Sequence, residues 1–270
     1  METMVKEKLN SQQLIDLENK YGAHNYHPLP VVLAKGEGVY VWDVEGKKYY
    51  DFLSAYSAVN QGHSHPKILK ALVDQASTLA LTSRAFYNNV LGVYEKYVTE
   101  YFGYDKVLPM NSGAEAVETA LKITRKWAYE VKGIDENEAK IIVCEGNFHG
   151  RTTTIVSFSS DPTSYTNFGP YTPGFIKIPY NDIDALEQAL KDDNVAGFLV
   201  EPIQGEAGVY VPNDGYLEEA YEQCKAAGVL FVADEVQTGI ARTGQLLACD
   251  HENVVPDVLI LGKALSGGVY

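Results

Sequence analysis

The sequence predicts an α/β fold with a mainly parallel β-sheet and helices on both faces. Two observations support this prediction. Short runs of apolar, often β-branched residues recur along the second half of the chain, and stretches with helical periodicity separate them. Such alternation is typical of parallel strands that helices cover on both sides. With 270 residues, the chain is long enough for one large domain and a small additional segment.

The individual elements follow from local patterns along the chain. Ser11 precedes apolar residues with helical spacing and can cap a short helix, whereas the turn-rich stretch 22–30 predicts no regular element. Glu45 and Gly46 form a predicted hairpin turn between two strands, and helical periodicity begins after Pro66. Helices are predicted over residues 11–21, 68–76, 91–102, 114–131, 183–190 and 216–227. Strands are predicted over residues 39–43, 48–52, 107–110, 141–144, 198–200, 229–233 and 258–261.

The composition excludes several classes of partner. Asp and Glu outnumber Lys and Arg by 36 to 22, and the net charge of −14 argues against binding to nucleic acid or anionic membranes, which requires clustered cations. No stretch reaches the ~20 apolar residues that a membrane helix needs. The three cysteines are far apart and match neither a metal site nor a disulfide spacing, which indicates a reducing compartment.

The first twenty residues predict a cytoplasmic protein. They mix acids with bases and lack an apolar core, so they do not form a secretory signal. Their acidic residues also fit poorly with a mitochondrial presequence, which makes the mitochondrial matrix the less favoured location.

Polar residues and glycines gather at the ends of the predicted strands. Ligands of open parallel sheets bind outside the carboxyl ends of the strands, and adjacent strands are ~4.8 Å apart, so groups at neighbouring ends can reach one small molecule. The segments in question are 112–115, 145–151, 201–202, 234–235 and 262–263. The pattern does not encode the order of the strands, so the convergence of these segments is a prediction.

Each of these residues has an ordinary and a chemical interpretation. Lys263 can be a solvated lysine, or an amine whose pKa burial lowers toward that of a nucleophile. Asp234 can cap a turn or hold a ligand. Gly113 can belong to a plain turn, or it can expose backbone N–H groups that receive a phosphate. Phe148 and His149 can pack in the interior or present a ring to a flat ligand.

Outside these positions the alternatives are similar. Arg151 can form a surface salt bridge or bind a carboxylate, and Glu206 lies in a glycine-containing loop that can place it in a pocket or in water. His63 and His65 are spaced like a pair of metal ligands, but Pro66 favours a turn there, so no metal site is predicted. Taken together, an amine, a carboxylate, a ring platform and a helix N-terminus are the groups that pyridoxal 5'-phosphate requires.

Two longer motifs resemble the class III aminotransferases, which use pyridoxal 5'-phosphate. Residues 232–239 read VADEVQTG, residues 111–116 read NSGAEA, and Lys263 follows Asp234 by 29 positions. Within that family the chain is most similar to the ornithine aminotransferases, through the stretches 22–30, 53–63, 146–152 and 201–208. The resemblance implies a fold type I transferase. Residues 1–60 would belong to a small domain that is otherwise missing, and residues 61–270 would form the large cofactor-binding domain, incomplete at its C-terminal end.

The resemblance also implies the residues that bind the cofactor. Lys263 would hold it as a Schiff base and shuttle a proton, and Asp234 would pair with the pyridinium nitrogen. Phe148 and Val236 would lie on the two faces of the ring. The backbone at the start of a helix would bind the phosphate, with help from a glutamine side chain. The implied cofactor-binding residues are Gly113, Ala114, Phe148, His149, Asp234, Val236, Gln237 and Lys263.

The implied substrates are L-ornithine and 2-oxoglutarate. Tyr26 and Arg151 would hold the α-amine and α-carboxylate of ornithine, Tyr56 would shape the pocket, and Glu206 would pair with an arginine that 2-oxoglutarate displaces. The reaction is a ping-pong exchange. Ornithine gives up its δ-amine and leaves as glutamate 5-semialdehyde, and 2-oxoglutarate then becomes glutamate. A fixed cation far from the reacting amine would select the terminal amine of the substrate.

Two further expectations and two alternatives complete the prediction. The full-length protein is a homodimer or higher homo-oligomer, and the chain is truncated after Tyr270. The first alternative is that the chain is a catalytically incompetent fragment that at most associates with a partner chain. The second is that the substrate is that of another class III aminotransferase, acetylornithine or 4-aminobutyrate.

Overall fold

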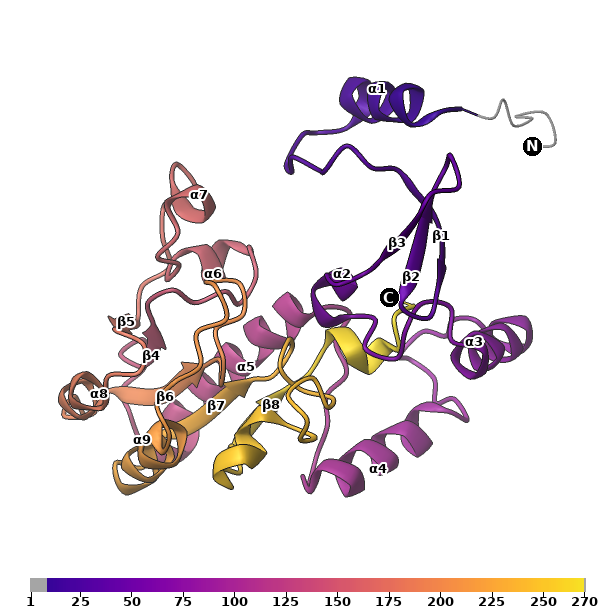
Figure 1. Ribbon diagram of the computed structural model, residues 1–270. Helices are drawn as coiled ribbons and strands as arrows, with labels where there is room; N and C mark the ends of the chain where they lie inside the picture. Colours follow the sequence, from indigo (N-terminus) through magenta and orange to yellow (C-terminus); the bar gives the residue numbers. More distant parts are fainter. Residues whose placement is uncertain (1–8, 270) are drawn as a thin grey trace. The chain divides into compact units, whose positions relative to one another are not determined.

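The computed structural model describes residues 9–269 of the chain. The chain divides into two compact units (Figure 1): one comprises Met1–Leu81 with Gly267–Tyr270, and the other comprises Thr82–Ser266. The predicted boundary between residues 60 and 61 concerns the domains of a longer protein and stays a prediction. The predictions for the first eight residues and for truncation after Tyr270 concern residues outside the described range.

The first unit contains a three-stranded antiparallel sheet. Its strands pair in chain order, and a hairpin turn joins the second to the third, as predicted: the N–H of Gly46 donates to the carbonyl of Asp43 over 3.0 Å. Asn10, not Ser11, caps the first helix, since its Oδ1 accepts from the N–H of Gln13 over 2.9 Å. The elements of this unit are α1 (Ser11–Tyr21), β1 (Leu33–Glu37), β2 (Tyr40–Asp43), β3 (Lys48–Tyr50), α2 (Ser54–Ser57) and α3 (Pro66–Thr78).

The second unit is built on a five-stranded sheet in the order β5-β4-β6-β7-β8. All four pairings are parallel, which confirms the predicted α/β class with a mainly parallel sheet. The strands are β4 (Lys140–Cys144), β5 (Phe175–Ile178), β6 (Val195–Val200), β7 (Leu230–Asp234) and β8 (Val258–Ile260).

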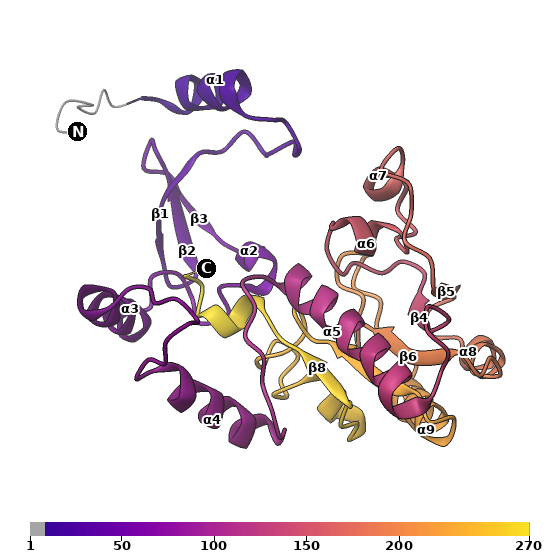
Figure 2. The same ribbon diagram turned by 180° about the vertical axis from the view of Figure 1, so that it is seen from behind.

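Helices cover both faces of this sheet, as predicted (Figure 2). On one face, α5 (Gly113–Trp127) packs in a core that includes Ile141 and Val143 of β4. On the other face, α8 (Ile183–Ala189) and α9 (Tyr216–Ala226) pack in a core that includes Ile142. Successive side chains of a strand point to opposite faces, so a continuous apolar run supplies both cores at once.

Three strand assignments differ from the sequence prediction, and the first is β1 of the other unit, which was not predicted. Residues 107–110 form no strand, because Pro109 has no N–H group to contribute to a ladder. Strand β5 was not predicted, because Lys177 interrupts its run of apolar residues. A lysine is tolerated there because β5 lies at the edge of the sheet. The remaining elements of this unit are α4 (Leu91–Phe102), the π-helix η1 (Ala128–Lys132), α6 (Thr153–Val156), α7 (Pro162–Tyr165) and the 3₁₀ helices η2 (Ala248–Glu252) and η3 (Lys263–Ser266). Among the described helices, none has the length and apolar character to cross a membrane.

Candidate active site

The carboxyl edge of the second sheet brings together residues that are far apart in the chain. Asp234 is the last residue of β7, and the register pairs Val200 of β6 with Ala233 of β7. Glu201, directly after β6, therefore lies beside Asp234. The loop with Phe148 and His149 follows β4, on the other side of β6. The predicted convergence of these strand ends is thus present in the fold.

A buried pair of acid and imidazole forms the centre of this edge. The Nδ1 atom of His149 lies 2.7 Å from Oδ2 of Asp234, and the two side chains are 1% and 5% exposed. The second oxygen of Asp234 accepts the N–H of Val236 over 3.1 Å. Burial alone would lower the pKa of His149, but its bond to Asp234 and the charges of Asp234 and Glu201 outweigh burial and raise that pKa. The pair therefore favours an imidazolium that donates to a carboxylate.

Lys263 opens the 3₁₀ helix η3 just after β8, with a positive φ of 42°. A lysine rarely adopts this left-handed conformation, and such residues are retained where the surrounding structure imposes them. Burial lowers the pKa of the Lys263 amine, and the negative charges of Glu206, Asp234 and Glu201 partly oppose this effect. The amine lies within the electrostatic reach of Asp234, so the acid and the amine share one edge of the sheet.

The start of α5 provides a cradle for an anion. Ser112 caps the helix by accepting the N–H of Glu115 through its hydroxyl, and the Glu115 carboxylate accepts the N–H of Ser112 over 3.2 Å. The N–H groups of Gly113 and Ala114 belong to the first helical turn, where no intrahelical carbonyl is available to them. With the positive end of the helix dipole, they suit a phosphate.

Close packing joins this cradle to the acid–imidazole loop. A Cβ atom on Gly113 would lie 3.0 Å from Cγ1 of Val236. A Cβ atom on Gly150 would lie 2.8 Å from Cβ of Ala114, and Gly150 has a φ of +121°. Glycine is required at position 150 both by conformation and by the close approach of α5. Val236, His149 and the first turn of α5 therefore surround one small region.

The predicted substrate residues of the second unit lie at the rim of this region. The guanidinium carbon of Arg151, an exposed residue, lies 5.6 Å from the centroid of the Phe148 ring, within the range of a cation–π contact. Glu206 is exposed, and its Oε1 accepts from Nε2 of Gln237 over 3.2 Å. The Gln237 amide therefore bonds a carboxylate here, and its assistance to a phosphate stays a prediction.

Tyr26 and Tyr56 belong to the first unit. Tyr26 lies in the segment before β1 and is 56% exposed, and Tyr56 lies in α2 with a φ of 55° and is 50% exposed. Their assignment to the ornithine pocket stays a prediction. The roles of the other predicted site residues are also predictions, although those of the second unit share the sheet edge described above.

Glu201 is a member of this edge to which the sequence analysis assigned no role. Its side chain is buried, and Oε2 accepts the N–H of Phe148 over 3.0 Å. Burial raises the pKa of Glu201 to about 7. One signal could have identified it: a carboxylate directly after six fully buried strand residues, Val195–Val200, is costly unless other groups hold it.

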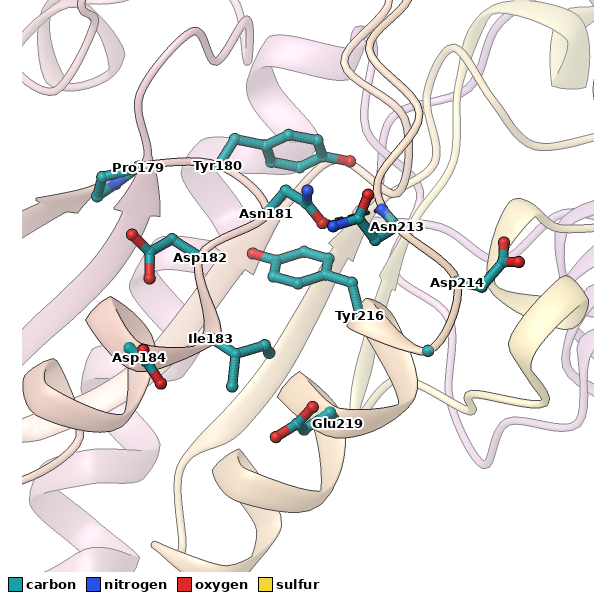
Figure 3. Close-up of a pocket in the computed structure, with 11 residues that line it drawn as sticks. Pro179, Tyr180, Asn181, Asp182, Ile183, Asp184, Asn213, Asp214, Tyr216 and Glu219 are labelled. Atoms are coloured by element: carbon teal, nitrogen blue, oxygen red, sulfur yellow. Dashed lines mark hydrogen bonds between the residues drawn. The ribbon is translucent and has the colours of Figure 1, made fainter.

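A surface pocket of about 590 Å³ lies near the end of β5 and the start of α9 (Figure 3). None of the predicted site residues lines it. Its lining includes Tyr180, whose hydroxyl donates to the carbonyls of Glu201 and Pro202 over 3.1 and 2.9 Å. The pocket wall therefore fixes the backbone at the end of β6, while the chemistry described above lies elsewhere.

The fold and this edge define a pyridoxal-phosphate type of transferase, and the comparisons agree. The chain belongs to the class III aminotransferase family, since residues 21–270 match the family described as Aminotransferase class-III. The ornithine aminotransferase of Drosophila ananassae, named as mitochondrial, is 66% identical over 260 residues, which are 96% of this chain and 60% of that protein.

Solved structures give the same relationship. The ornithine aminotransferase from Toxoplasma gondii, which has pyridoxal phosphate at partial occupancy in its active site, superposes with a TM-score of 0.97 at 54% identity. The acetylornithine aminotransferase from Elizabethkingia anophelis is 68% identical, with a TM-score of 0.86. Both alignments cover 97% of this chain and 62% of the other. The chain thus spans about 60% of the length of the curated relatives it matches.

Proposed function

We propose that this chain carries the cofactor site of an aminotransferase that moves the δ-amino group of L-ornithine to 2-oxoglutarate through pyridoxal 5'-phosphate. The observation that carries the proposal is the buried pair of His149 and Asp234, 2.7 Å apart, at the sheet edge that also bears Lys263. The relatives named as ornithine aminotransferases, at 60–66% identity, support the choice of substrate.

The residues at this edge fit the cofactor. Asp234 would hold a proton on its ring nitrogen, and the N–H groups of Gly113 and Ala114 would bind its phosphate. When bound, pyridoxal phosphate supplies an electron sink for the bond that breaks at the carbon bearing the amine. Val236 packs close to Gly113, since a Cβ atom on Gly113 would lie 3.0 Å from Cγ1 of Val236.

Lys263 provides the amine. Because burial lowers its pKa, a larger fraction of the side chain is neutral near neutral pH than for a solvated lysine, and a neutral amine can attack a carbonyl or accept a proton. The backbone of Lys263 is strained, with a φ of 42°, and the surrounding tertiary structure holds it in that conformation. In the proposed reaction Lys263 holds the cofactor and then moves the proton at the reacting carbon.

Substrate orientation would depend on charge at the rim. Arg151 would bind the α-carboxylate of ornithine, and Tyr26 and Tyr56 would complete the pocket. Among the negative charges that raise the pKa of the Lys263 amine, that of Glu206 has the largest effect. Holding the α-carboxylate away from Lys263 would leave the δ-amine as the reacting end.

Acetylornithine is the second candidate substrate, and the 68% identity with the acetylornithine aminotransferase from Elizabethkingia anophelis favours it. An assay of the purified protein with ornithine, acetylornithine and 4-aminobutyrate, each with 2-oxoglutarate, separates the candidates. We expect the highest kcat/KM with ornithine. A preference for either of the other amines would overturn the substrate proposal.

Assembly and location are also proposals. A homodimer is supported by the exposed apolar side chains of α4 and the segment before it, among them Phe86, Tyr87, Val93 and Tyr97, which a second copy could cover. A cytoplasmic location is supported by the buried, unpaired cysteines Cys144, Cys224 and Cys249, which suit a reducing compartment. Light scattering, which measures the molar mass in solution, tests the homodimer. Cell fractionation, which separates cytoplasm from mitochondrial matrix, tests the location.

A further inference from the structure

The position of Glu201 between two interacting groups is a consequence of strand order. His149 follows β4, and Asp234 is the last residue of β7. Strand β6 lies between these two strands, but the two side chains still form a hydrogen bond. Adjacent strands are ~4.8 Å apart, so the bond spans the end of β6. The first residue beyond β6 is Glu201, and it is 7% exposed. Glu201 is therefore buried at the strand end that the acid–imidazole pair bridges.

The protein anchors Glu201 at both main chain and side chain. The hydroxyl of Tyr180 donates to the Glu201 carbonyl, and the N–H of Phe148 donates to Oε2 of the Glu201 carboxylate. Phe148 directly precedes His149, so one hydrogen bond couples the carboxylate to the loop that carries the imidazole. A buried carboxylate in a fixed place is costly unless it stabilises a positive charge.

The imidazole of His149 is the positive group that needs this support. Its Nδ1 is bonded to Asp234, and its Nε2 is buried without a hydrogen-bond partner among the described residues. A nearby negative charge can stabilise an imidazolium without a hydrogen bond, and the negative charge of Glu201 raises the pKa of His149. The same interaction favours the ionised form of Glu201.

The groups that face the Glu201 carboxyl come from several elements. Its charged partners are His149 after β4, Asp234 at the end of β7 and Lys263 in η3. Cys144 of β4 and Tyr180 after β5 are the neutral titratable neighbours that feel its charge. Burial and Asp234 oppose ionisation of Glu201, whereas His149, Lys263 and the Phe148 N–H favour it, so the pKa of Glu201 is about 7.

We propose that Glu201 is a positioning residue whose carboxylate holds His149 as an imidazolium, which in turn donates to and orients the Asp234 carboxylate. The last part, orientation of Asp234 toward a cofactor ring, rests on the proposed function. The charge coupling between Glu201 and His149 does not, because it is a property of the protein without added cofactor.

The test is a titration of the histidine side chains by ¹⁵N NMR in the 270-residue chain without added pyridoxal phosphate. His149 is one of six histidines, and a His149→Gln variant assigns its signal. Glu201→Gln removes the charge and keeps an acceptor for the Phe148 N–H, and Glu201→Asp keeps the charge. Glu145→Gln removes an exposed carboxylate after the neighbouring strand β4 and serves as the matched control.

We expect Glu201→Gln to weaken proton binding by His149 about tenfold, while Glu201→Asp and Glu145→Gln change it by less than about twofold. Equal titration of His149 in Glu201→Gln and the unaltered chain would overturn the proposal. So would an equal loss in Glu145→Gln, which would indicate a general field effect.

A reciprocal measurement applies even if Glu201→Gln does not fold. In His149→Gln, loss of the imidazolium should raise the pKa of Glu201, read from its ¹³C carboxyl shift. An unchanged carboxyl titration there contradicts the coupling. Because neither measurement involves pyridoxal phosphate, a chain that binds no cofactor but shows both shifts refutes the proposed function and supports this inference.

Discussion

Nδ1 of His149 and Oδ2 of Asp234 lie 2.7 Å apart, although 85 residues separate them in the chain. The contact crosses the end of β6, and the two side chains are only 1% and 5% exposed. A buried carboxylate that is held by an imidazole can keep a fixed orientation toward a ligand. This relationship is the basis of the first prediction.

Asp234→Asn is expected to lower the rate at which ornithine changes the visible spectrum of the protein with pyridoxal phosphate by about 10²–10⁴-fold. The amide cannot hold a proton on a ring nitrogen as a carboxylate does, although it can still accept from His149. Stopped-flow absorbance measures the rate. Asp192→Asn, which removes a partly exposed partner of Lys140, should leave the rate unchanged. A similar rate in Asp234→Asn would remove Asp234 from the proposed site.

Lys263→Ala is expected to abolish the visible absorption that a covalent lysine adduct of pyridoxal phosphate produces. The reason is that the methyl group offers no amine. The measurement is an absorbance titration of the 270-residue chain. Lys225→Ala, at an exposed position of α9, is the control and should retain the absorption. If the unaltered chain shows no such absorption, the alternative of a catalytically incompetent fragment gains support.

The stability of the second unit is expected to decrease as the pH rises from about 4.5 to about 7. Glu201 has a pKa of about 7 in the fold against an ordinary value of 4.5, so its folded-state pKa is raised. Such a group contributes stability below pH 4.5 that is lost as the pH rises through 7. Burial lowers the pKa of His149, but its acidic partners outweigh burial and raise it above the ordinary value of 6.5. The contribution of His149 to stability is therefore also lost as the pH rises, above about 6.5.

Comparison of the unaltered chain with Glu201→Gln isolates the contribution of Glu201. In urea denaturation at several pH values, the free energy of unfolding of the unaltered chain should fall by roughly 1–3 kcal/mol between pH 4.5 and 7 because of Glu201. The Glu201→Gln variant should not show this decrease. Parallel curves for the two proteins would contradict the assigned pKa shift.

Gly150→Ala is expected to destabilise the protein by about 2–4 kcal/mol and to displace the loop of Phe148 and His149. The added Cβ would lie 2.8 Å from Cβ of Ala114, and alanine disfavours a φ of +121°. Gly133→Ala is the matched control, because its φ of +84° is also positive but nothing lies within 4 Å of the added atom. That variant should lose only about 1 kcal/mol. Thermal unfolding of both variants measures the difference, and equal losses would refute the packing argument.

Much of the sheet could be predicted from apolar runs alone. Strands β4, β6 and β7 are buried on both faces, so each needs a run without polar interruption, and such runs are visible in the sequence. Strand β8 lies at the edge of the sheet and is only partly buried, but its three residues are also all apolar. Strands β1 and β5 were missed, because a mostly exposed strand such as β1 and an edge strand with a lysine such as β5 have no such requirement. The strand expected at residues 107–110 was wrong because the pattern gave no weight to the missing N–H of Pro109.

By itself, the sequence identified the candidate amine, acid and helix N-terminus of the site, since Lys263, Asp234 and Gly113 each stand in a local motif beside a strand or helix end. Only the tertiary structure decided that His149 bonds to Asp234 and that Glu201 is buried at the end of the strand between theirs. The physical reason is that hydrogen bonds and charge interactions depend on distance through space and on burial. Both follow from the strand order β4-β6-β7, which no local pattern encodes.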